Sequence, residues 1–109
     1  MLHRLHYKDF YLELERENRC AVAIFTQPQC GTCRKLHTKI TAENPSMDIF
    51  LIAAEDAPGL IEEWEIFHLP HILLFKNGLF HRHVHMDWSY TFQELIHLNL
   101  HAPPQEAPC

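Results

Sequence analysis

Short apolar runs alternate with longer mixed segments along the chain, which is the pattern of strands separated by helices. The runs occupy residues 20–26, 48–54 and 70–75, and a weaker one covers residues 2–6. Apolar runs of four to eight residues that are rich in valine, isoleucine and phenylalanine are typical of strands buried on both faces. Residues 80–86 instead alternate polar and apolar side chains, which predicts an edge strand.

Two segments between the first three strands have helical spacing. The first begins at Asp9, a residue type that caps helix N-termini, and ends at Asn18. Phe10 and Leu14 lie on its apolar face. The second covers residues 31–43 and stops at the Asn-Pro-Ser sequence that follows it.

Two further helices are predicted in the second half of the chain. One opens at Pro58, since proline is favoured in the first helical turn, and we expect its Trp64 and Phe67 to pack in the core. The other is capped by Ser89. The apolar positions of this last helix recur at helical spacing and are Phe92, Leu95, Ile96 and Leu100.

The elements follow the order β-α-β-α-β-α-β-β-α, which predicts parallel strands with helices on both faces of the sheet. Asn77-Gly78 separates the last two strands and is a strong hairpin signal, so one antiparallel edge is expected. The sequence therefore predicts an α/β fold with a central mixed sheet of four to five strands and four flanking helices. One domain covers residues 1–101, and the proline-rich tail, residues 102–109, suits neither a helix nor a sheet interior.

The composition is that of a globular protein and excludes several function classes. Of the 109 residues, 47% are hydrophobic and 21% are charged, and no apolar run approaches the roughly 20 residues that span a bilayer. The first nine residues hold no signal-peptide core, so we expect a cytoplasmic protein. The net charge of −5 argues against a nucleic-acid surface, although ten histidines would reverse its sign if all were protonated.

Two of the four cysteines, Cys30 and Cys33, are separated by two residues at the turn from a strand into a helix. The free N–H groups and the positive dipole of a helix N-terminus favour a thiolate, which is the form that attacks disulfides. The pair could instead bind a metal, but a closed zinc site needs four ligands and the sequence has no second pair of this kind. Redox chemistry is therefore the better interpretation.

The remaining two cysteines have no evident catalytic role. Cys20 is expected to pack at the start of the central strand. Cys109 is the last residue of the sequence, and an accessible thiol there could form an intermolecular disulfide under oxidation. We expect a monomer, with a dimer through Cys109 as the alternative.

Three histidines, His81, His83 and His85, recur at every second position. On a regular strand this spacing puts all three side chains on one face. They could bind a metal ion, or they could simply keep an edge strand polar. Because no further ligands are evident on neighbouring elements, the second interpretation is favoured.

Two motifs together make the chain resemble the thioredoxin family. One is the strand that leads into Cys30-Gly31-Thr32-Cys33 and a helix. The other is the segment of residues 69–78, which ends in Phe-Lys-Asn-Gly and corresponds to a family segment that begins with a cis proline. Pro58 heads the third helix as it does in thioredoxins. The resemblance extends from the first strand to Leu100 and implies the thioredoxin fold.

The resemblance also implies a function. Thioredoxins are thiol–disulfide oxidoreductases that act on protein disulfides, so Cys30 would be the nucleophile and Cys33 the resolving thiol. We expect no bound cofactor and no metal, and the family implies recycling by an NADPH-dependent thioredoxin reductase. The residues implied to contact the substrate are Gln29, Leu69, Pro70, which would be cis, and His71.

Several residues around the pair depart from the family pattern. Gln29 replaces the usual tryptophan and Thr32 replaces the usual proline, so we expect a reduction potential less negative than roughly −270 mV. Ile24 and Leu51 replace a buried aspartate and its lysine partner. An apolar surround disfavours a thiolate, so Cys33 should be harder to deprotonate. We therefore keep an alternative function, a protein-interaction module or redox sensor with little turnover.

His71 replaces a threonine of the family and has two interpretations. As a protonated neighbour it would stabilise the Cys30 thiolate or carry protons; otherwise its ring only packs on the loop. Met86 lies near a position where the family often has glycine. We therefore expect a reshaped groove and a different range of substrates.

Overall fold

Five strands form one mixed sheet in the part of the chain that the structure, a computed structural model, describes: residues 2–16 and 19–108. The strand order is β1-β3-β2-β4-β5, with β1, β3 and β2 parallel and β4 and β5 antiparallel to their neighbours. The strands are β1 (Leu2–Arg4), β2 (Cys20–Thr26), β3 (Asp48–Ala53), β4 (His71–Lys76) and β5 (Leu79–Val84). This arrangement confirms the predicted α/β class and the antiparallel pairing of the last two strands. The expectation of parallel neighbours before that hairpin is wrong for β4, which also runs antiparallel to β2.

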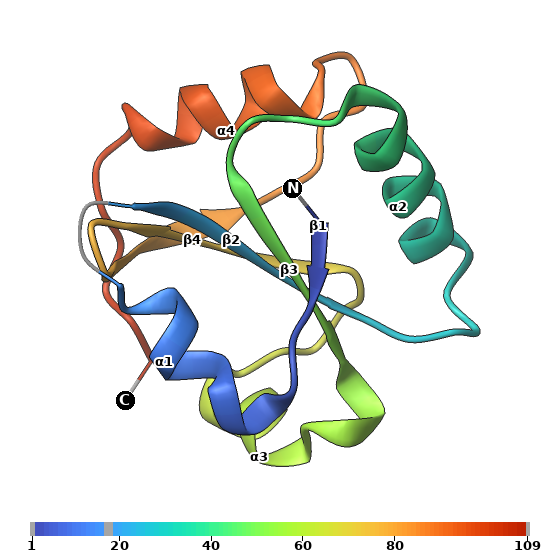
Figure 1. The fold of residues 1–109 in the computed structure, drawn as a ribbon, viewed down its shortest axis with the longest axis vertical. Coiled ribbons are helices and arrows are strands. Elements are labelled where there is room, and N and C mark those ends of the chain that lie inside the picture. The colour runs from blue at the N-terminus through green and yellow to red at the C-terminus, as the bar shows by residue number, and fades with distance from the viewer. Residues whose placement is uncertain (1, 17–18, 109) are drawn as a thin grey trace.

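Helices cover both faces of the sheet (Figure 1). The helices are α1 (Phe10–Leu14), α2 (Gly31–Glu43), α3 (Pro58–Glu63) and α4 (Phe92–Leu100), with short 3-10 turns η1 (Tyr7–Asp9) and η2 (Ala54–Asp56). Figure 1 shows α2 and α4 on one face and α1 and α3 on the other. Among the described residues, no helix has both the length and the apolar character needed to cross a membrane.

Alternate residues of β2 build the two halves of the core. Val22 and Ile24 face α2 and α4, while Ala21, Ala23 and Phe25 face α1 and α3. Successive side chains of a strand point to opposite faces, so one strand supplies both layers. All five side chains are at most 1% exposed, which places β2 at the centre of the molecule.

The first helix is shorter than the sequence pattern predicts. Its five residues end at Leu14, and Asp9 closes the preceding 3-10 turn without making a side-chain cap hydrogen bond. Phe10 and Leu14 are buried as expected. The predicted end at Asn18 lies outside the described residues.

The predicted cap of the last helix is also wrong. Ser89 bonds locally to the Asp87 carboxylate through both its hydroxyl and its backbone N–H. The helix begins two residues later, where Thr91 accepts from the Glu94 N–H and Glu94 accepts from the Thr91 N–H. This reciprocal capping box satisfies two helix-end donors, which a single serine cap would not do.

Phe67 does not pack in the core, contrary to the prediction. The helix α3 ends at Glu63, and the chain then turns through Glu65, whose φ of 51° is left-handed. Phe67 therefore lies beyond the helix and does not share the buried face on which Trp64 lies. Trp64 and Ile66 are buried, whereas the side chain of Phe67 is 83% exposed.

The proline-rich tail lies along the outer edge of β5. The Gln105 N–H donates to the His81 carbonyl over 2.7 Å, and the His83 N–H donates to Gln105 Oε1 over 2.8 Å. Arg82 Nη1 donates to the Pro103 carbonyl. The tail thus forms hydrogen bonds with backbone groups of β5 that would otherwise be free to pair with a further strand.

Candidate active site

The cysteine pair stands where β2 passes into α2. After Thr26 the chain turns, and the Cys30 N–H donates to the Gln27 carbonyl over 3.2 Å. Cys30 is the N-cap of α2, and its sulfur accepts the Cys33 N–H over 3.1 Å. This N–H and the positive end of a 13-residue helix stabilise negative charge on the Cys30 sulfur.

The two sulfur atoms form an intramolecular disulfide, with 5.1 Å between the Cα atoms of Cys30 and Cys33. Cys33 is 3% exposed and belongs to the buried face of α2. Cys30 is only partly buried. A sulfur from another molecule therefore has access to Cys30 rather than to Cys33.

The loop before β4 reaches the pair from the other half of the chain. The Leu69–Pro70 peptide bond is cis, and the Leu69 carbonyl oxygen lies 3.6 Å from Cys30 Sγ. Leu69, Pro70 and His71 are all partly buried, and Gln29 is exposed in the loop before Cys30. The structure thus brings Leu69 against the reactive sulfur, with Pro70 and His71 following directly in the chain.

His71 meets His83 of the neighbouring strand. Their Nε2 and Nδ1 atoms are 2.9 Å apart, so one ring donates a hydrogen bond to the other. Burial, together with the nearby charges of His83, His85 and His68, lowers the pKa of His71 to about 4. Burial and His85 also lower the pKa of His83. His71 is therefore neutral near pH 7, which disfavours its interpretation as a cation beside Cys30.

The three alternating histidines, of which His81 and His83 belong to β5, do not all share a face. The pairing with β4 shifts between Leu74 and Phe75, and such an irregularity breaks the strict alternation of side chains. His83 faces His71, whereas His81 is buried against α4 and the tail, with Nε2 close to the carbonyls of Asn99 and Ala102. His85 lies beyond the end of β5 and is exposed. Among the described residues, no three histidine, cysteine or acidic side chains are arranged to hold a metal.

Beneath the pair, the sheet is apolar. Ile24 and Leu51 are directly opposite each other on β2 and β3, and they are 0% and 7% exposed. Leu51 and Cys33 line the same pocket of about 410 Å³, whose other lining residues include Arg4, His37 and Glu55. No charged group takes the place of either side chain on these strands, so nothing at these two positions can accept a proton from Cys33.

The sequence of this chain matches a known protein family over nearly the whole of the fold. A sequence model of the family described as Thioredoxin matches residues 2–96, which include all five strands, the cysteine pair and the cis-proline loop. The chain belongs to the thioredoxin family. Among curated proteins, no sequence matches it.

Solved thioredoxin structures share the fold at low sequence identity. Thioredoxin from Malassezia sympodialis superposes with a TM-score of 0.74 at 17% identity, covering 91% of this chain and 90% of that one. Thioredoxin NaTrxh from Nicotiana alata gives 0.65 at 19%, covering 77% and 79%. Oxidised mitochondrial thioredoxin 3 from Saccharomyces cerevisiae gives 0.65 at 19%, covering 77% and 82%. The fold is therefore that of thioredoxins, and the Cys30–Cys33 pair supports a general thiol–disulfide redox function.

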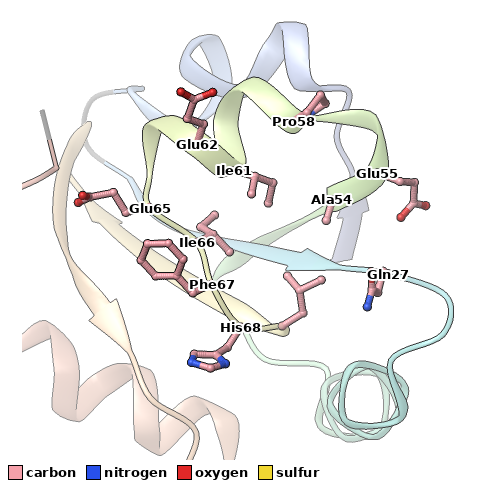
Figure 2. Close-up of a pocket in the computed structure, with 11 residues that line it drawn as sticks. Gln27, Ala54, Glu55, Pro58, Ile61, Glu62, Glu65, Ile66, Phe67 and His68 are labelled. Atoms are coloured by element: carbon pink, nitrogen blue, oxygen red, sulfur yellow. The ribbon is translucent and has the colours of Figure 1, made fainter.

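Two hollows flank the cis-proline loop of this thioredoxin-family site. The first, which we call the acidic groove, measures about 670 Å³. Figure 2 shows its lining, which consists of Gln27, Ala54, Glu55, Pro58, Ile61, Glu62, Glu65, Ile66, Phe67, His68 and Leu69. The second, the histidine pocket, measures about 300 Å³ and includes Thr32, Pro70, His71, His83 and Met86. Phe67 lines both hollows and therefore stands on the ridge between them.

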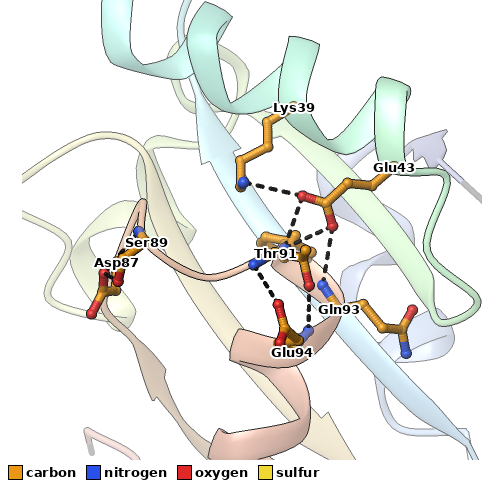
Figure 3. Close-up of polar contacts among 8 residues, drawn as sticks. Lys39, Glu43, Asp87, Ser89, Thr91, Gln93 and Glu94 are labelled. Carbon is orange, nitrogen blue, oxygen red and sulfur yellow. Dashed lines mark hydrogen bonds and ion pairs between the residues drawn. The ribbon is translucent and has the colours of Figure 1, made fainter.

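The helix that carries the cysteines is fixed at its far end (Figure 3). The Glu43 carboxylate accepts the backbone N–H groups of Phe92 and Gln93 at the start of α4 and pairs with Lys39. Burial alone would raise the pKa of Glu43, but these N–H donors and Lys39 outweigh it and lower the pKa. The brace holds α2 against α4, so the position of the pair at the other end is well defined.

The other two cysteines lie away from the site. Cys20 packs beside the core at the opposite end of β2, as expected, and burial together with Asp48 raises the pKa of its thiol. A raised pKa keeps this thiol protonated and unreactive. Cys109 lies outside the described residues, so a dimer through it stays a prediction.

Sequence reasoning missed the acidic groove and the partner of His71. Nothing in the sequence marks Glu65 as left-handed, because glycine and asparagine are the usual signals for that conformation. Phe67 was therefore assigned to the core. His83 could have been linked to His71 only through the register of β4 and β5, which follows from the Asn77-Gly78 turn and the bulge beyond it.

Proposed function

We propose that this thioredoxin-family chain is a thiol–disulfide oxidoreductase that acts on protein disulfides through Cys30 and Cys33. The observation that carries the proposal is the placement of Cys30 Sγ. It accepts the Cys33 N–H at the start of α2 and lies 3.6 Å from the Leu69 carbonyl at the cis-proline loop. Cys33 is buried directly behind it.

The reaction proceeds by two sulfur exchanges. The Cys30 thiolate attacks one sulfur of a substrate disulfide, forming a mixed disulfide and releasing the other substrate sulfur as a thiolate, which takes up a proton. Cys33 then loses its proton and attacks Cys30 Sγ, which releases the second substrate thiolate. The substrate gains two electrons, and the chain is left with the Cys30–Cys33 disulfide.

The second exchange is the step that the surroundings of the pair make slow. Ile24 and Leu51 offer no proton acceptor, and Cys33 is 3% exposed, so its thiolate is costly to form. We expect Cys33 deprotonation to limit turnover at neutral pH. An increase of the turnover rate with pH above 7, absent from the first exchange, is the kinetic signature.

We also propose that an NADPH-dependent thioredoxin reductase returns electrons to the pair. The family membership supports this partner, while exposed Gln29 in place of a tryptophan changes the surface that the reductase would contact. NADPH consumption with a thioredoxin reductase and an excess of insulin measures the coupling. The same experiment with glutathione and glutaredoxin tests the other common electron source.

The decisive experiment is insulin reduction by the full chain with dithiothreitol. We expect turnover well above background, and a loss of at least about 100-fold in Cys30→Ser, because the nucleophile is removed. Cys20→Ser is the matched control, since it removes a thiol at the other end of β2 and should keep full activity. Equal rates for the wild type and Cys30→Ser would overturn the proposal.

A second candidate function follows from the apolar surround of Cys33. If resolution is too slow for turnover, the chain would act as a redox sensor or a protein-interaction module. In that case Cys33→Ser and the wild type would form a mixed disulfide with a defined disulfide protein at the same rate, while neither turns it over. Multiple turnovers by the wild type would exclude this alternative.

A further inference from the structure

The acidic groove begins beside the residues that contact Cys30. Two of its lining residues contact Cys30: the Gln27 carbonyl accepts the Cys30 N–H over 3.2 Å, and the Leu69 carbonyl lies 3.6 Å from Cys30 Sγ. An extended chain advances about 3.3 Å per residue. A substrate whose cysteine is joined to Cys30 would therefore lay its next two or three residues along this groove.

Apolar side chains line the groove and leave one aromatic ring exposed at its edge. Ile61, Ile66 and Phe67 line it, and Phe67 is 83% exposed. Figure 2 shows these three side chains between the carboxylates of the rim. A large exposed aromatic side chain beside a concave apolar surface is the arrangement that binding sites use to hold an apolar side chain of a partner.

The rim of the groove carries negative charge. Glu55, Glu62 and Glu65 line it, and no lysine or arginine does. Within residues 2–16 and 19–108, none of these three carboxylates forms an ion pair with a basic side chain. All three glutamates are exposed, so each attracts a cation only modestly, and their combined field at the groove favours a cation at low ionic strength.

We propose that the acidic groove selects protein disulfides whose reacting cysteine lies within about three residues of an apolar residue and a lysine or arginine. The occupant is an extended basic segment of the substrate protein: its apolar side chain contacts Phe67, and its cation lies beside the carboxylate of Glu62 or Glu65, with Glu55 adding negative charge on the far side of the groove. This inference rests on the proposed function and names its substrate class.

The test uses short disulfide-linked peptides that differ only beside the cysteine, with Lys-Leu, Gln-Leu or Glu-Leu in the flanking positions. We expect reduced full-length protein to reduce the lysine peptide about tenfold faster than the glutamate peptide at low ionic strength, with the glutamine peptide between them. About 0.5 M salt should remove most of this preference, because the Debye length then falls below about 5 Å. Equal rates for the three peptides would overturn the inference.

Matched variants locate the effect. Glu62→Gln combined with Glu65→Gln should lower the preference for lysine to about threefold or less. Glu63→Gln removes the same kind of charge from α3 outside the groove lining and should leave the preference intact. Phe67→Ala should slow the lysine and glutamate peptides equally, by about five- to tenfold, without changing their ratio. A Glu63→Gln effect as large as that of the double variant would assign the preference to net charge and contradict the groove.

A binding measurement separates this inference from the proposed function. Cys30→Ser cannot exchange disulfides, so its affinity for the three peptides, each with serine in place of cysteine, reports on the groove alone. Tighter binding of the lysine peptide by at least about fivefold supports the groove even if the wild type reduces no disulfide. Equal binding of the three peptides contradicts it even if the wild type is an efficient reductase.

Discussion

The two sides of the Cys30–Cys33 pair differ sharply in chemistry. On the inner side, Ile24 and Leu51 present only hydrocarbon, at 0% and 7% exposure. On the outer side, His71 lies against His83, with further histidines and glutamates lining the two hollows. Ionisable groups are thus gathered around the opening of the site and are absent from the two positions beneath it.

The two sides of the pair therefore have different roles, one in the stability of the fold and the other in reactivity. A well-packed apolar pair in place of a buried ion pair is often neutral or stabilising, because neither group has to be desolvated. The outer histidines behave differently, because their burial disfavours the protonated form and lowers the pKa values of His71 and His83. The inner side therefore stabilises the fold, and the outer side is where pH and substrate charge act.

The largest effect is expected from placing a charge on the inner side. Ile24→Asp should lower the free energy of unfolding by about 3–5 kcal/mol at pH 7, because an unpaired carboxylate is buried in an apolar layer. Urea unfolding measures the change. Ile24→Val is the control and should cost only about 1 kcal/mol.

Adding the partner charge sharpens this test. Since Ile24 and Leu51 are opposite each other in register, Leu51→Lys should recover at least about 1 kcal/mol in the Ile24→Asp background. Additive losses in the double variant would show that the two positions are not coupled. A loss below about 1 kcal/mol for Ile24→Asp alone would contradict the apolar layer inferred beneath the pair.

The next effect concerns a histidine of β5 that is structural. The carbonyls of Asn99 and Ala102 can only accept, so His81 Nε2 must carry the proton that both share. His81→Leu should lower the free energy of unfolding by about 2 kcal/mol, because both carbonyls lose their donor in a partly buried position. His85→Leu, on the exposed side of the same sequence pattern, should change it by less than about 0.5 kcal/mol in thermal unfolding.

His71, on the outer side, should make the stability of the fold depend on pH. Folding lowers the pKa of His71 from about 6.5 to about 4, so between these values the unfolded chain binds a proton that the folded chain does not. Stability is therefore unaffected above pH 6.5 and falls as the pH drops towards 4. Because His71 is only half-buried, solvent screens part of the shift, and we expect a loss of about 1–2 kcal/mol.

A matched pair of variants isolates this contribution. Unfolding by urea at several pH values should show a shallower acid loss in His71→Gln than in the wild type. His97→Gln, which removes an exposed histidine on α4, should retain the wild-type pH profile. Identical profiles for all three proteins would contradict the lowered pKa of His71.

The smallest effect is expected at the brace between α2 and α4. Glu43→Gln keeps one oxygen for the Phe92 N–H but loses the charge that strengthens this bond, so the free energy of unfolding should fall by about 0.5 kcal/mol. The lowered pKa of Glu43 means that this contribution is present at neutral pH and is lost in acid as the carboxylate protonates. Thermal unfolding at pH 7 and pH 3 measures it, and a larger difference between the two proteins at pH 3 than at pH 7 would be the wrong sign.

Sequence reasoning predicted the central strand and the cysteine-bearing helix correctly, but it misplaced several side chains at the surface around the site. The strand of residues 20–26 and the helix of residues 31–43 were predicted with their observed bounds, because apolar runs and caps are local signals. Ile24 and Leu51 could be identified from the family pattern, and their buried pairing agrees with it. Phe67 was misplaced because a turn without glycine ended its helix, and His81 and His83 were put on one face because a bulge leaves no mark in the sequence.

The tail along β5 has a consequence for how the molecule behaves beside copies of itself. A sheet with open edges invites strand-by-strand association into aggregates, and short or covered edges prevent it. Here β1 has only three residues, and at the opposite edge Gln105 bonds to the backbone of His81 and His83. Removal of residues 103–109 would uncover that second edge, so the segment with the least regular structure protects the sheet from polymerisation.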